Sequence, residues 1–449
     1  MESQTQPAHG LRTFFTIWSG QLVSLVGSQL TGFAMGVWVY TQTRSVLMLA
    51  LVQVAAQAPY VLLSPVAGVL ADRWNRRTAM MVSDAGAGLS VLAAGLLYIT
   101  HQLQFWMVIP INLWMASFNT LMWPSLTAAV TLLVPRQHYG RANGFVQLGE
   151  AVPQIAGPAM AGALYVAIHL GNMALIDFST YAFSVLLMLF FVRIPNPPHT
   201  SADDKIRGSF WKEMRFGWDY VTARKGLLGL LLFFMATNFL SGVMSPLLVP
   251  LILDTWDAST LGYISTLMGV GMLAGTLVMS AWGGGRHKIY TLLGFGVLMG
   301  LFLTAVGLRT SLPLLCVCGV GVMFCSPFMN ACSQAIWQAK VAPDVQGRVF
   351  AVRRTIAWCA GLIAPLLAAP LADYIFKPGM QADGILARLL GPIFGVGASR
   401  GIGVLISLVG VLTVGVAVFA LFTPLIRRVE LDIPNHGAAP AAEAGPTPA

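Results

Sequence analysis

Charged residues are scarce in this sequence. Asp, Glu, Lys and Arg make up 10% of its 449 residues, whereas a soluble globular domain carries about 25%. This shortage excludes an ordinary soluble enzyme, and the 56% share of hydrophobic residues excludes a disordered chain. A helix of roughly 20 apolar residues spans a bilayer, and about twelve such spans with short loops account for the length. The composition therefore predicts a polytopic membrane protein.

Motifs for catalytic or metal chemistry are also missing. The sequence has no phosphate loop of the GxxxxGK[ST] type, so ATP is not expected to drive the protein directly. No histidine pairs with a carboxylate at the spacing of metal ligands, and no serine lies in a nucleophile motif. The five cysteines all lie in two late apolar stretches, and an odd number inside a membrane argues against disulfide bonds. We therefore expect no enzyme activity, no metal and no cofactor.

The net charge of +9 does not indicate a nucleic-acid partner, because the basic residues are scattered one loop at a time. They do indicate orientation, since cytoplasmic loops carry an excess of Lys and Arg. If the N-terminus is cytoplasmic, all but five of the 26 Lys and Arg residues fall inside. The five exceptions are Arg44, Arg309, Lys377, Arg388 and Arg400. Both termini are therefore predicted to be cytoplasmic.

Hydropathy predicts helices in two sets of six. The first set spans 14–40, 47–71, 79–100, 105–130, 143–168 and 172–193, and the second spans 227–253, 259–282, 290–309, 312–339, 348–375 and 400–423. The grouping predicts an N-terminal six-helix half (1–193), a cytoplasmic linker (194–226), a C-terminal six-helix half (227–428) and a disordered tail (429–449). Apolar residues at helical spacing from Phe210 to Val221 predict an amphipathic helix in the linker, and a second interfacial helix is expected from Ile385 to Phe394.

An internal repeat supports two duplicated halves. Gly140-Arg141 aligns with Gly347-Arg348 at an offset of 207 residues, and a proline follows each glycine by eighteen residues, at Pro158 and Pro365. Halves that repeat with the same orientation are the parallel repeats of a major-facilitator architecture.

The segment GVLADRWNRR, from Gly68 to Arg77, resembles motif A of the major facilitator superfamily and lies at the expected place between helices 2 and 3. The phrases WSGQLVSLVGSQLTGFAMGVWVY in helix 1 and LIDFSTYAF in helix 6 resemble the drug-exporter branch with macrolide-efflux and enterobactin-export proteins. The resemblance implies an all-α membrane protein of twelve transmembrane helices in two pseudo-symmetric six-helix halves.

Motif A also implies a gate. Gly68 would let the second predicted span (47–71) and the eleventh (348–375) approach closely, as small residues do in membranes. Asp72 would face the positive N-terminus of the span 348–375, next to Arg348. In the family such contacts close the cytoplasmic side while the cavity faces outward. The resemblance therefore assigns gating to Gly68, Asp72, Arg73, Arg76, Arg77 and Arg348. The alternative is that the arginines only determine topology.

Ionisable residues inside membrane spans are costly and are usually functional. Glu150 lies ten residues past Gly140, near the bilayer midplane, and shares a helix face with Gln147 and Gln154. It is the first candidate for proton coupling, with Asp84 and Asp177 as further candidates; the alternative for each is a structural role. The span 105–130 lacks the arginine that many proton-coupled relatives carry there, so the coupling ion stays open.

In the implied fold, the first, fourth, seventh and tenth predicted spans (14–40, 105–130, 227–253 and 312–339) line the central cavity. Their polar and aromatic residues favour a bulky, amphipathic and mostly neutral or cationic substrate: Gln21, Ser24, Ser28, Asn112, Asn119, Trp123, Asn238, Ser241, Asn330, Gln334, Trp337 and Gln338. We expect a monomeric exporter in a bacterial cytoplasmic membrane, with a small molecule and the lipid bilayer as partners and the proton gradient as its energy source. The alternatives are uptake or facilitated diffusion by the same fold, or a receptor or scaffold without transport.

Overall fold

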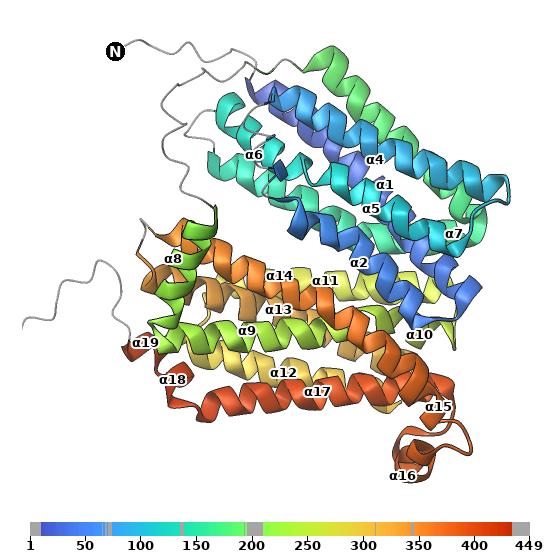
Figure 1. The fold of residues 1–449 in the computed structure, drawn as a ribbon, viewed down its shortest axis with the longest axis vertical. Helices are drawn as coiled ribbons and strands as arrows, with labels where there is room; N and C mark the ends of the chain where they lie inside the picture. The colour runs from blue at the N-terminus through green and yellow to red at the C-terminus, as the bar shows by residue number, and fades with distance from the viewer. Residues whose placement is uncertain are drawn as a thin grey trace, which may run out of the picture.

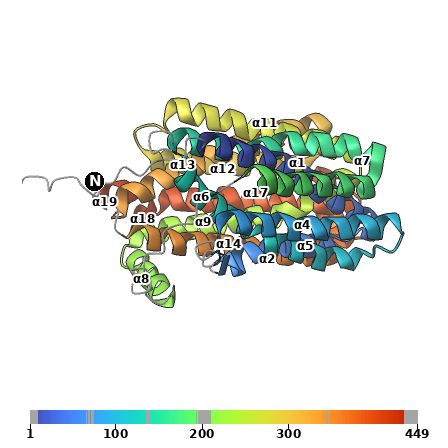
Figure 2. The same cartoon turned by 90° about the horizontal axis from the view of Figure 1, so that it is seen from above.

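The computed structural model describes residues 10–64, 66–67, 70, 74–134, 139–192, 194, 210–309, 311–342 and 345–432. Every regular element in these residues is a helix, and the long helices lie side by side in two bundles (Figure 1 and Figure 2). Long apolar segments form helices because, in lipid, each backbone N–H and C=O must be satisfied within its own segment. The predicted all-α class is confirmed.

The N-terminal bundle is formed by the first six long elements of the chain. They are α1 (Gly10–Thr43), α2 (Val46–Leu62), α4 (Arg76–Ile99), α5 (Val108–Asn119) after the short η1 (Phe105–Met107), α6 (Met122–Leu133) and α7 (Tyr139–Phe191). Non-helical backbone at His169, with φ 57° and ψ 176°, interrupts α7. The interruption falls between the predicted spans 143–168 and 172–193.

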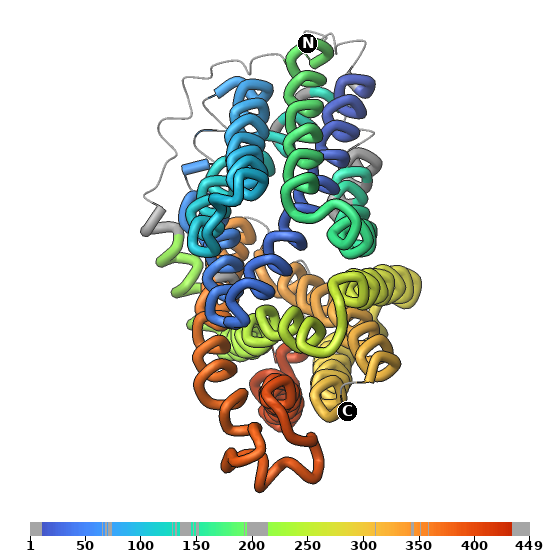
Figure 3. The backbone as a smooth tube through the Cα atoms, turned by 90° about the vertical axis from the view of Figure 1, so that its right-hand side faces the viewer, coloured from blue at the N-terminus to red at the C-terminus, as the bar shows by residue number. Residues whose placement is uncertain are grey.

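The C-terminal bundle follows after the linker and packs beside the first (Figure 3). Its elements are α9 (Lys225–Met244), η4 (Ser245–Leu247), α10 (Leu248–Leu253), α11 (Ala258–Trp282), α12 (Lys288–Leu308), α13 (Leu312–Lys340), α14 (Gln346–Pro370), η5 (Leu371–Phe376), α15 (Lys377–Gly379) and α17 (Ala398–Phe422).

The structure describes ten helical stretches that are long and apolar enough to cross a membrane. The predicted count of twelve differs for two reasons. The described part of α2 has 17 residues, and one stretch (Val152–Phe191) runs through the interruption at His169. The twelve-helix count and the cytoplasmic termini therefore stay predictions.

Two short amphipathic helices were predicted outside the bundles, and both form. In the linker, α8 (Phe210–Thr222) packs on α14, where a Cβ on Gly217 would lie 2.8 Å from the carbonyl oxygen of Arg348. At the other end of the bundle, α16 (Ile385–Phe394) exposes Ile385 and Leu389. Burial of such a face in the membrane interface stays a prediction.

The tail was predicted to be disordered from residue 429, and this is wrong for its first four residues. After α18 (Pro424–Arg427), residues Val429–Asp432 form α19. The Glu430 carboxylate accepts hydrogen bonds from the backbone N–H groups of Lys288 and Ile289, at 3.2 Å each. It thereby satisfies free N–H groups at the start of α12. Residues 433–449 lie outside the described residues.

The two bundles meet through small residues of α7 and α11. A Cβ on Gly262 would lie 2.5 Å from the carbonyl oxygen of Pro158 and 2.8 Å from the Cα of Gly162. Glycines allow this close approach of helix backbones. Gly162 of α7 therefore lies in close contact with α11.

Candidate functional site

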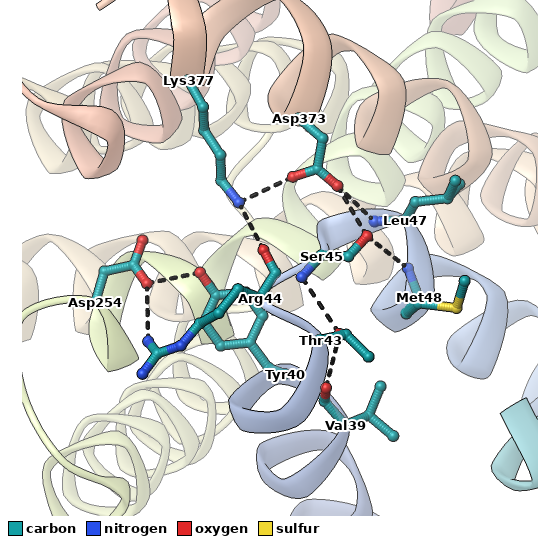
Figure 4. A network of polar contacts seen from close by, with 10 residues as sticks. All are labelled: Val39, Tyr40, Thr43, Arg44, Ser45, Leu47, Met48, Asp254, Asp373 and Lys377. Atoms are coloured by element: carbon teal, nitrogen blue, oxygen red, sulfur yellow. Dashed lines mark hydrogen bonds and ion pairs between the residues drawn. The ribbon is translucent and has the colours of Figure 1, made fainter. Parts of the chain in front are cut away.

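A set of polar contacts joins the two halves at one end of the bundles (Figure 4). The Asp254 carboxylate, just after α10, accepts a 2.6 Å hydrogen bond from the Tyr40 hydroxyl at the end of α1. The Arg44 guanidinium lies 3.5 Å from the same oxygen, but its side chain is 63% exposed. Exposed ion pairs contribute about 0–1 kcal/mol, whereas a hydrogen bond to a charged group contributes about 1.5–3 kcal/mol. The Tyr40–Asp254 bond is therefore the stronger contact.

The second carboxylate of this end is Asp373, on η5. Its Oδ2 accepts from the Ser45 hydroxyl and from the backbone N–H of Leu47, both at 3.1 Å. Its Oδ1 accepts from the Lys377 ammonium at 2.9 Å, and the same ammonium donates to the Arg44 carbonyl at 3.3 Å. Arg44 has a left-handed φ of 51°, which turns the chain between α1 and α2 toward these partners. We call this network the clasp: Tyr40, Arg44, Ser45, Asp254, Asp373 and Lys377.

The halves are joined by hydrogen bonds only toward the clasp end, within the residues that the structure describes. Besides the clasp, the Ser245 hydroxyl at the end of α9 donates to the Gln53 side chain of α2 at 3.1 Å. In Figure 1 the ribbons of the two bundles meet near α2 and α10 and diverge toward α6 and α8. Among the described residues, the polar contacts between the halves therefore lie at the clasp end.

A buried carboxylate lies inside the N-terminal half. Asp84 of α4 is 1% exposed, and its Oδ2 accepts from Gln21 of α1 and from Ser184 of α7, at 2.7 Å each. Both donors are neutral, and no cation pairs with Asp84 among the described residues. A buried charge without a counter-ion is costly, and protonation removes that cost.

Asp177 is the second buried carboxylate of this half, with 0% exposure. Its Oδ1 lies 3.4 Å from the Thr180 hydroxyl. One turn further along α7, the Tyr181 hydroxyl meets the Ser28 hydroxyl at 2.8 Å and the Asn119 amide at 3.3 Å. The two carboxylates and these neutral groups form a polar seam through the bundle: Gln21, Ser28, Asp84, Asn119, Asp177, Tyr181 and Ser184.

The seam corrects the predicted cavity face of α1. Gln21, Ser24 and Asn112 are buried inside the N-terminal half, and Ser28 and Asn119 bond within it. Gln21, Ser28 and Asn119 point inward because the carboxylates and hydroxyls there need partners. Trp123 is 36% exposed and remains a candidate for the cavity.

The polar face of α13 is exposed, and its role in lining the cavity stays a prediction. Asn330, Gln334 and Gln338 are exposed, whereas Trp337 is fully buried, which corrects its placement on that face. Arg353 of α14 donates to Gln334 at 3.0 Å and lies 5.2 Å from the centre of the Trp337 ring. On α9, Asn238 is half-buried and Ser241 is exposed.

Several predicted gate and coupling residues lie outside the description. Gly68, Asp72 and Arg73 are not among the described residues, and Glu150 lies on α7 with its side chain undescribed. Their roles stay predictions.

The contacts described for the basic residues of the predicted gate do not cross between the two halves. Arg77 donates to the carbonyls of Met188 and Leu189, at 2.9 and 2.6 Å, and so satisfies the end of α7. The Arg348 guanidinium lies 5.3 Å from the centre of the Phe216 ring on α8. Arg76 begins α4, and its Nε and one terminal nitrogen have no hydrogen-bond partner among the described residues.

The sequence interpretation missed the clasp. Its residues belong to three separate stretches, and Tyr40 and Asp254 lie 214 positions apart. The available signal was the location of ionisable residues at the ends of predicted spans on one side of the membrane. That signal indicates on which side of the membrane the residues lie, but it does not show which of them contact one another.

Two helical bundles in contact through small residues and closed at one end define a membrane transporter of the major facilitator type. The fold of a bacterial homologue of the human lysosomal transporter Spinster, solved in an inward-facing and unoccupied conformation, is similar. Its TM-score is 0.70 at 15% identity, over 95% of this chain and 98% of that one. The chain belongs to the transmembrane secretion effector family, whose model matches residues 6–365.

Two relatives of the chain are efflux proteins. Macrolide efflux protein A of Streptococcus pyogenes is 30% identical over 373 residues, which cover 81% of this chain and 90% of that protein. The enterobactin exporter EntS of Shigella flexneri is 25% identical over 281 residues, which cover 61% of this chain and 63% of that protein. The protein is therefore a multi-pass membrane transporter and not an enzyme.

Proposed function

We propose that the protein is a secondary active exporter of a hydrophobic or amphipathic small molecule, such as a macrolide, a siderophore or a peptide-like metabolite. It would act as a monomer with twelve spans in a bacterial cytoplasmic membrane. The names of the relatives support export rather than uptake. The observation that carries the proposal is the clasp itself, a network of polar contacts that joins the two halves at one end of the bundles.

The direction of opening follows from the predicted topology. Arg44 and Lys377 belong to the end predicted to face outside, whereas Arg76, Arg286 and Arg348 belong to the end predicted to be cytoplasmic. The clasp then closes the outer mouth, and the exposed polar face of α13 is reached from the cytoplasm. An exporter loads its substrate in such a state and releases it after the halves rock apart at the clasp.

Proton antiport is the proposed energy source. Asp84 and Asp177 are buried among neutral partners, so each is more easily accommodated when protonated. Rocking that admits water to one of them would change its proton occupancy. Glu150 remains a third candidate for the same role.

The predicted gate would act in the opposite state. When the outer mouth opens, Asp72 would approach the start of α14 next to Arg348 and hold the cytoplasmic side closed. Arg73, Arg76 and Arg77 would support this contact, and Gly68 would allow it.

Export is tested by erythromycin accumulation in a bacterial host that lacks its own efflux pumps. Cells with the protein should accumulate less erythromycin than empty cells, and an uncoupler should abolish the difference. Accumulation above that of empty cells would indicate uptake. Accumulation equal to that of empty cells, for a range of hydrophobic drugs, would contradict export.

A matched pair of glycine substitutions tests the rocking of the halves. Gly262→Ala places a Cβ against the backbone of Pro158 and Gly162, whereas a Cβ on Gly361 meets no atom within 4 Å. Gly262→Ala should lower export and Gly361→Ala should not, with equal amounts of both variants in the membrane. Equal export by the two variants would argue against closure through the contact between α7 and α11.

A further inference from the structure

A cavity of about 290 Å³ lies inside the C-terminal half, between α9, α10, α11, α12 and α13. Four methionines from four different helices line it: Met244, Met268, Met299 and Met323. Aliphatic side chains supply most of the remaining wall, and the only hydroxyls are those of Ser241 and Ser245. The lining contains no charged residue.

The cavity has a polar edge and an apolar back. Ser241 of α9 and Ser245, the first residue of η4, are both exposed, and Ser245 donates to Gln53 in the N-terminal half. Met299 of α12, at the back, is 7% exposed. The edge therefore faces the other half. It also lies close to the clasp, because the lining residue Ile252 is two positions from Asp254.

The size and lining define what can enter. A dry apolar cavity of about 150 Å³ holds one benzene molecule, so this one suits a group of about two fused rings or a branched alkyl group. Drug-sized ligands need roughly 300–1,000 Å³, so only part of such a molecule fits. Methionine side chains are flexible and polarizable, and they adapt to apolar groups of different shape. A charged group would lose its hydration here without finding a partner.

One wall of the cavity belongs to the contact between the halves. Ile264 and Met268 of α11 line the cavity, and Gly262, two residues before Ile264, packs on Pro158 and Gly162 of α7. A movement of α7 relative to α11 therefore reaches the cavity wall within about one helical turn.

We propose that this cavity binds the uncharged apolar group of the exported molecule, while the polar remainder of that molecule stays between the halves near Ser241 and the polar face of α13. The assignment rests on the proposed export function and names the chemistry that the substrate must carry. Rocking of the halves, transmitted through α11, would then change the shape of the cavity and release the group.

The test measures binding of the neutral dye N-phenyl-1-naphthylamine to the purified full-length protein in lipid nanodiscs, after subtraction of empty nanodiscs. Met299→Trp fills the back of the cavity. Leu298→Trp, at the neighbouring position of α12, adds the same side chain to a residue that does not line the cavity and is 38% exposed. Met299→Trp should weaken dye binding by about tenfold or more, and Leu298→Trp should leave it unchanged.

A second variant guards against misfolding. Ser241→Phe adds an apolar ring at the exposed edge, where no core contact is lost, and it should also weaken dye binding. Elution volume and thermal unfolding are measured for all three variants. Unchanged dye affinity in folded Met299→Trp and Ser241→Phe would overturn the assignment, whether or not erythromycin is exported. Weakened binding without any export of hydrophobic drugs would leave the cavity assigned and refute the export function instead.

Discussion

The two halves are built from similar helices but bury different groups. In the N-terminal half, Asp84 and Asp177 are the buried carboxylates that the structure describes. The described core of the C-terminal half is apolar, with the rings of Phe295 and Phe328 stacked at 3.9 Å, and the same half contains the methionine cavity. Its buried polar residues are hydroxyls, together with Lys340 near the end of α13. The halves are therefore not chemically equivalent, although their helices are.

This difference separates two tasks. A proton needs a carboxylate that tolerates both charge states, and neutral donors such as Gln21 and Ser184 supply that environment. An apolar group needs a cavity without polar groups that would lose their water. If proton coupling and the binding of an apolar group occur as proposed, the N-terminal half binds and releases the proton and the C-terminal half binds the apolar group. Rocking of the halves couples the two events.

The largest effect is expected when a carboxylate is placed in the C-terminal core. Cys325 of α13 has 0% exposure within an apolar cluster. In Cys325→Asp the new carboxylate lacks the donors that Asp84 has, and a charge at the centre of a span costs about 2.5–3.5 kcal/mol or more. We expect loss of folded protein, measured as the yield of a single symmetric elution peak.

Cys325→Ser is the matched control for that substitution. Its hydroxyl is neutral, of similar size, and able to bond to a backbone carbonyl of its own helix. A normal yield of Cys325→Asp would mean that the C-terminal core hosts a carboxylate as readily as the N-terminal core does.

The next effect concerns Asp84 itself. Asp84→Asn can keep an acceptor oxygen toward Gln21 and Ser184, but it cannot gain or lose a proton. We expect uphill export to fall by about 100-fold, a loss typical of a removed proton-transfer group. Exchange of labelled for unlabelled erythromycin across proteoliposomes, which needs no net proton movement, should persist.

Loss of both uphill export and exchange would assign Asp84 a structural role. If Asp84→Asn exported at the full rate against a gradient, Asp84 would not be the coupling residue, and Asp177 or Glu150 would remain as candidates.

Helix positions could be predicted from the sequence because lipid forces every span to be long, apolar and helical. The predicted span 312–339 forms α13 (Leu312–Lys340), and 259–282 forms α11 (Ala258–Trp282). Close packing at Gly162 was also predictable, since small residues at a helix interface have few other uses in a membrane.

The direction in which polar side chains point could not be predicted in the same way. Gln21, Ser24 and Ser28 share a helical face, but spacing does not say whether that face meets the cavity or the neighbouring helices. The answer depends on Asp84 and Ser184, which lie 63 and 163 positions from Gln21. The same limit explains Trp337, which packs against Arg353 from another helix.

A moderate effect is expected at the clasp, where the two unlike halves are joined. Asp373→Asn weakens the contacts to Lys377 and to Ser45, and loss of a charged hydrogen bond costs about 1.5–3 kcal/mol. The clasp should therefore be open about tenfold more often. Distances between spin labels at Gln42 and Thr255, in a cysteine-free background, report this opening across the halves.

Asp383→Asn is the control, because Asp383 is exposed at the same end and lies outside the clasp. Labels at Gln42 and Gln102, both in the N-terminal half, should keep their distance in every variant. An unchanged distance distribution between Gln42 and Thr255 in Asp373→Asn would show that apolar packing alone closes this end.

The smallest expected effect lies at the start of α11. The predicted duplication pairs α2 with α11, and their N-caps differ: Ser45 is neutral, whereas Asp257 is charged. The Asp257 carboxylate accepts from the Thr260 side chain and backbone N–H and from the Ser259 hydroxyl, at 2.6 to 2.9 Å. These hydrogen bonds, led by that of the Thr260 side chain, lower the pKa of Asp257 to about 2.

A pKa that is lower in the folded state means that the charged form stabilises the fold. The contribution of Asp257 is therefore complete above pH of about 4, the usual value for an aspartate, and is lost as the pH falls toward 2. Asp257→Ala should lower the stability by about 1 kcal/mol at neutral pH. The difference in unfolding temperature from the wild type should then shrink on acidification, while that of Asp257→Asn should start smaller and vary less. A difference that stays constant down to pH 2 would mean that the charge on Asp257 adds nothing to its cap, and that the starts of α2 and α11 are equivalent after all.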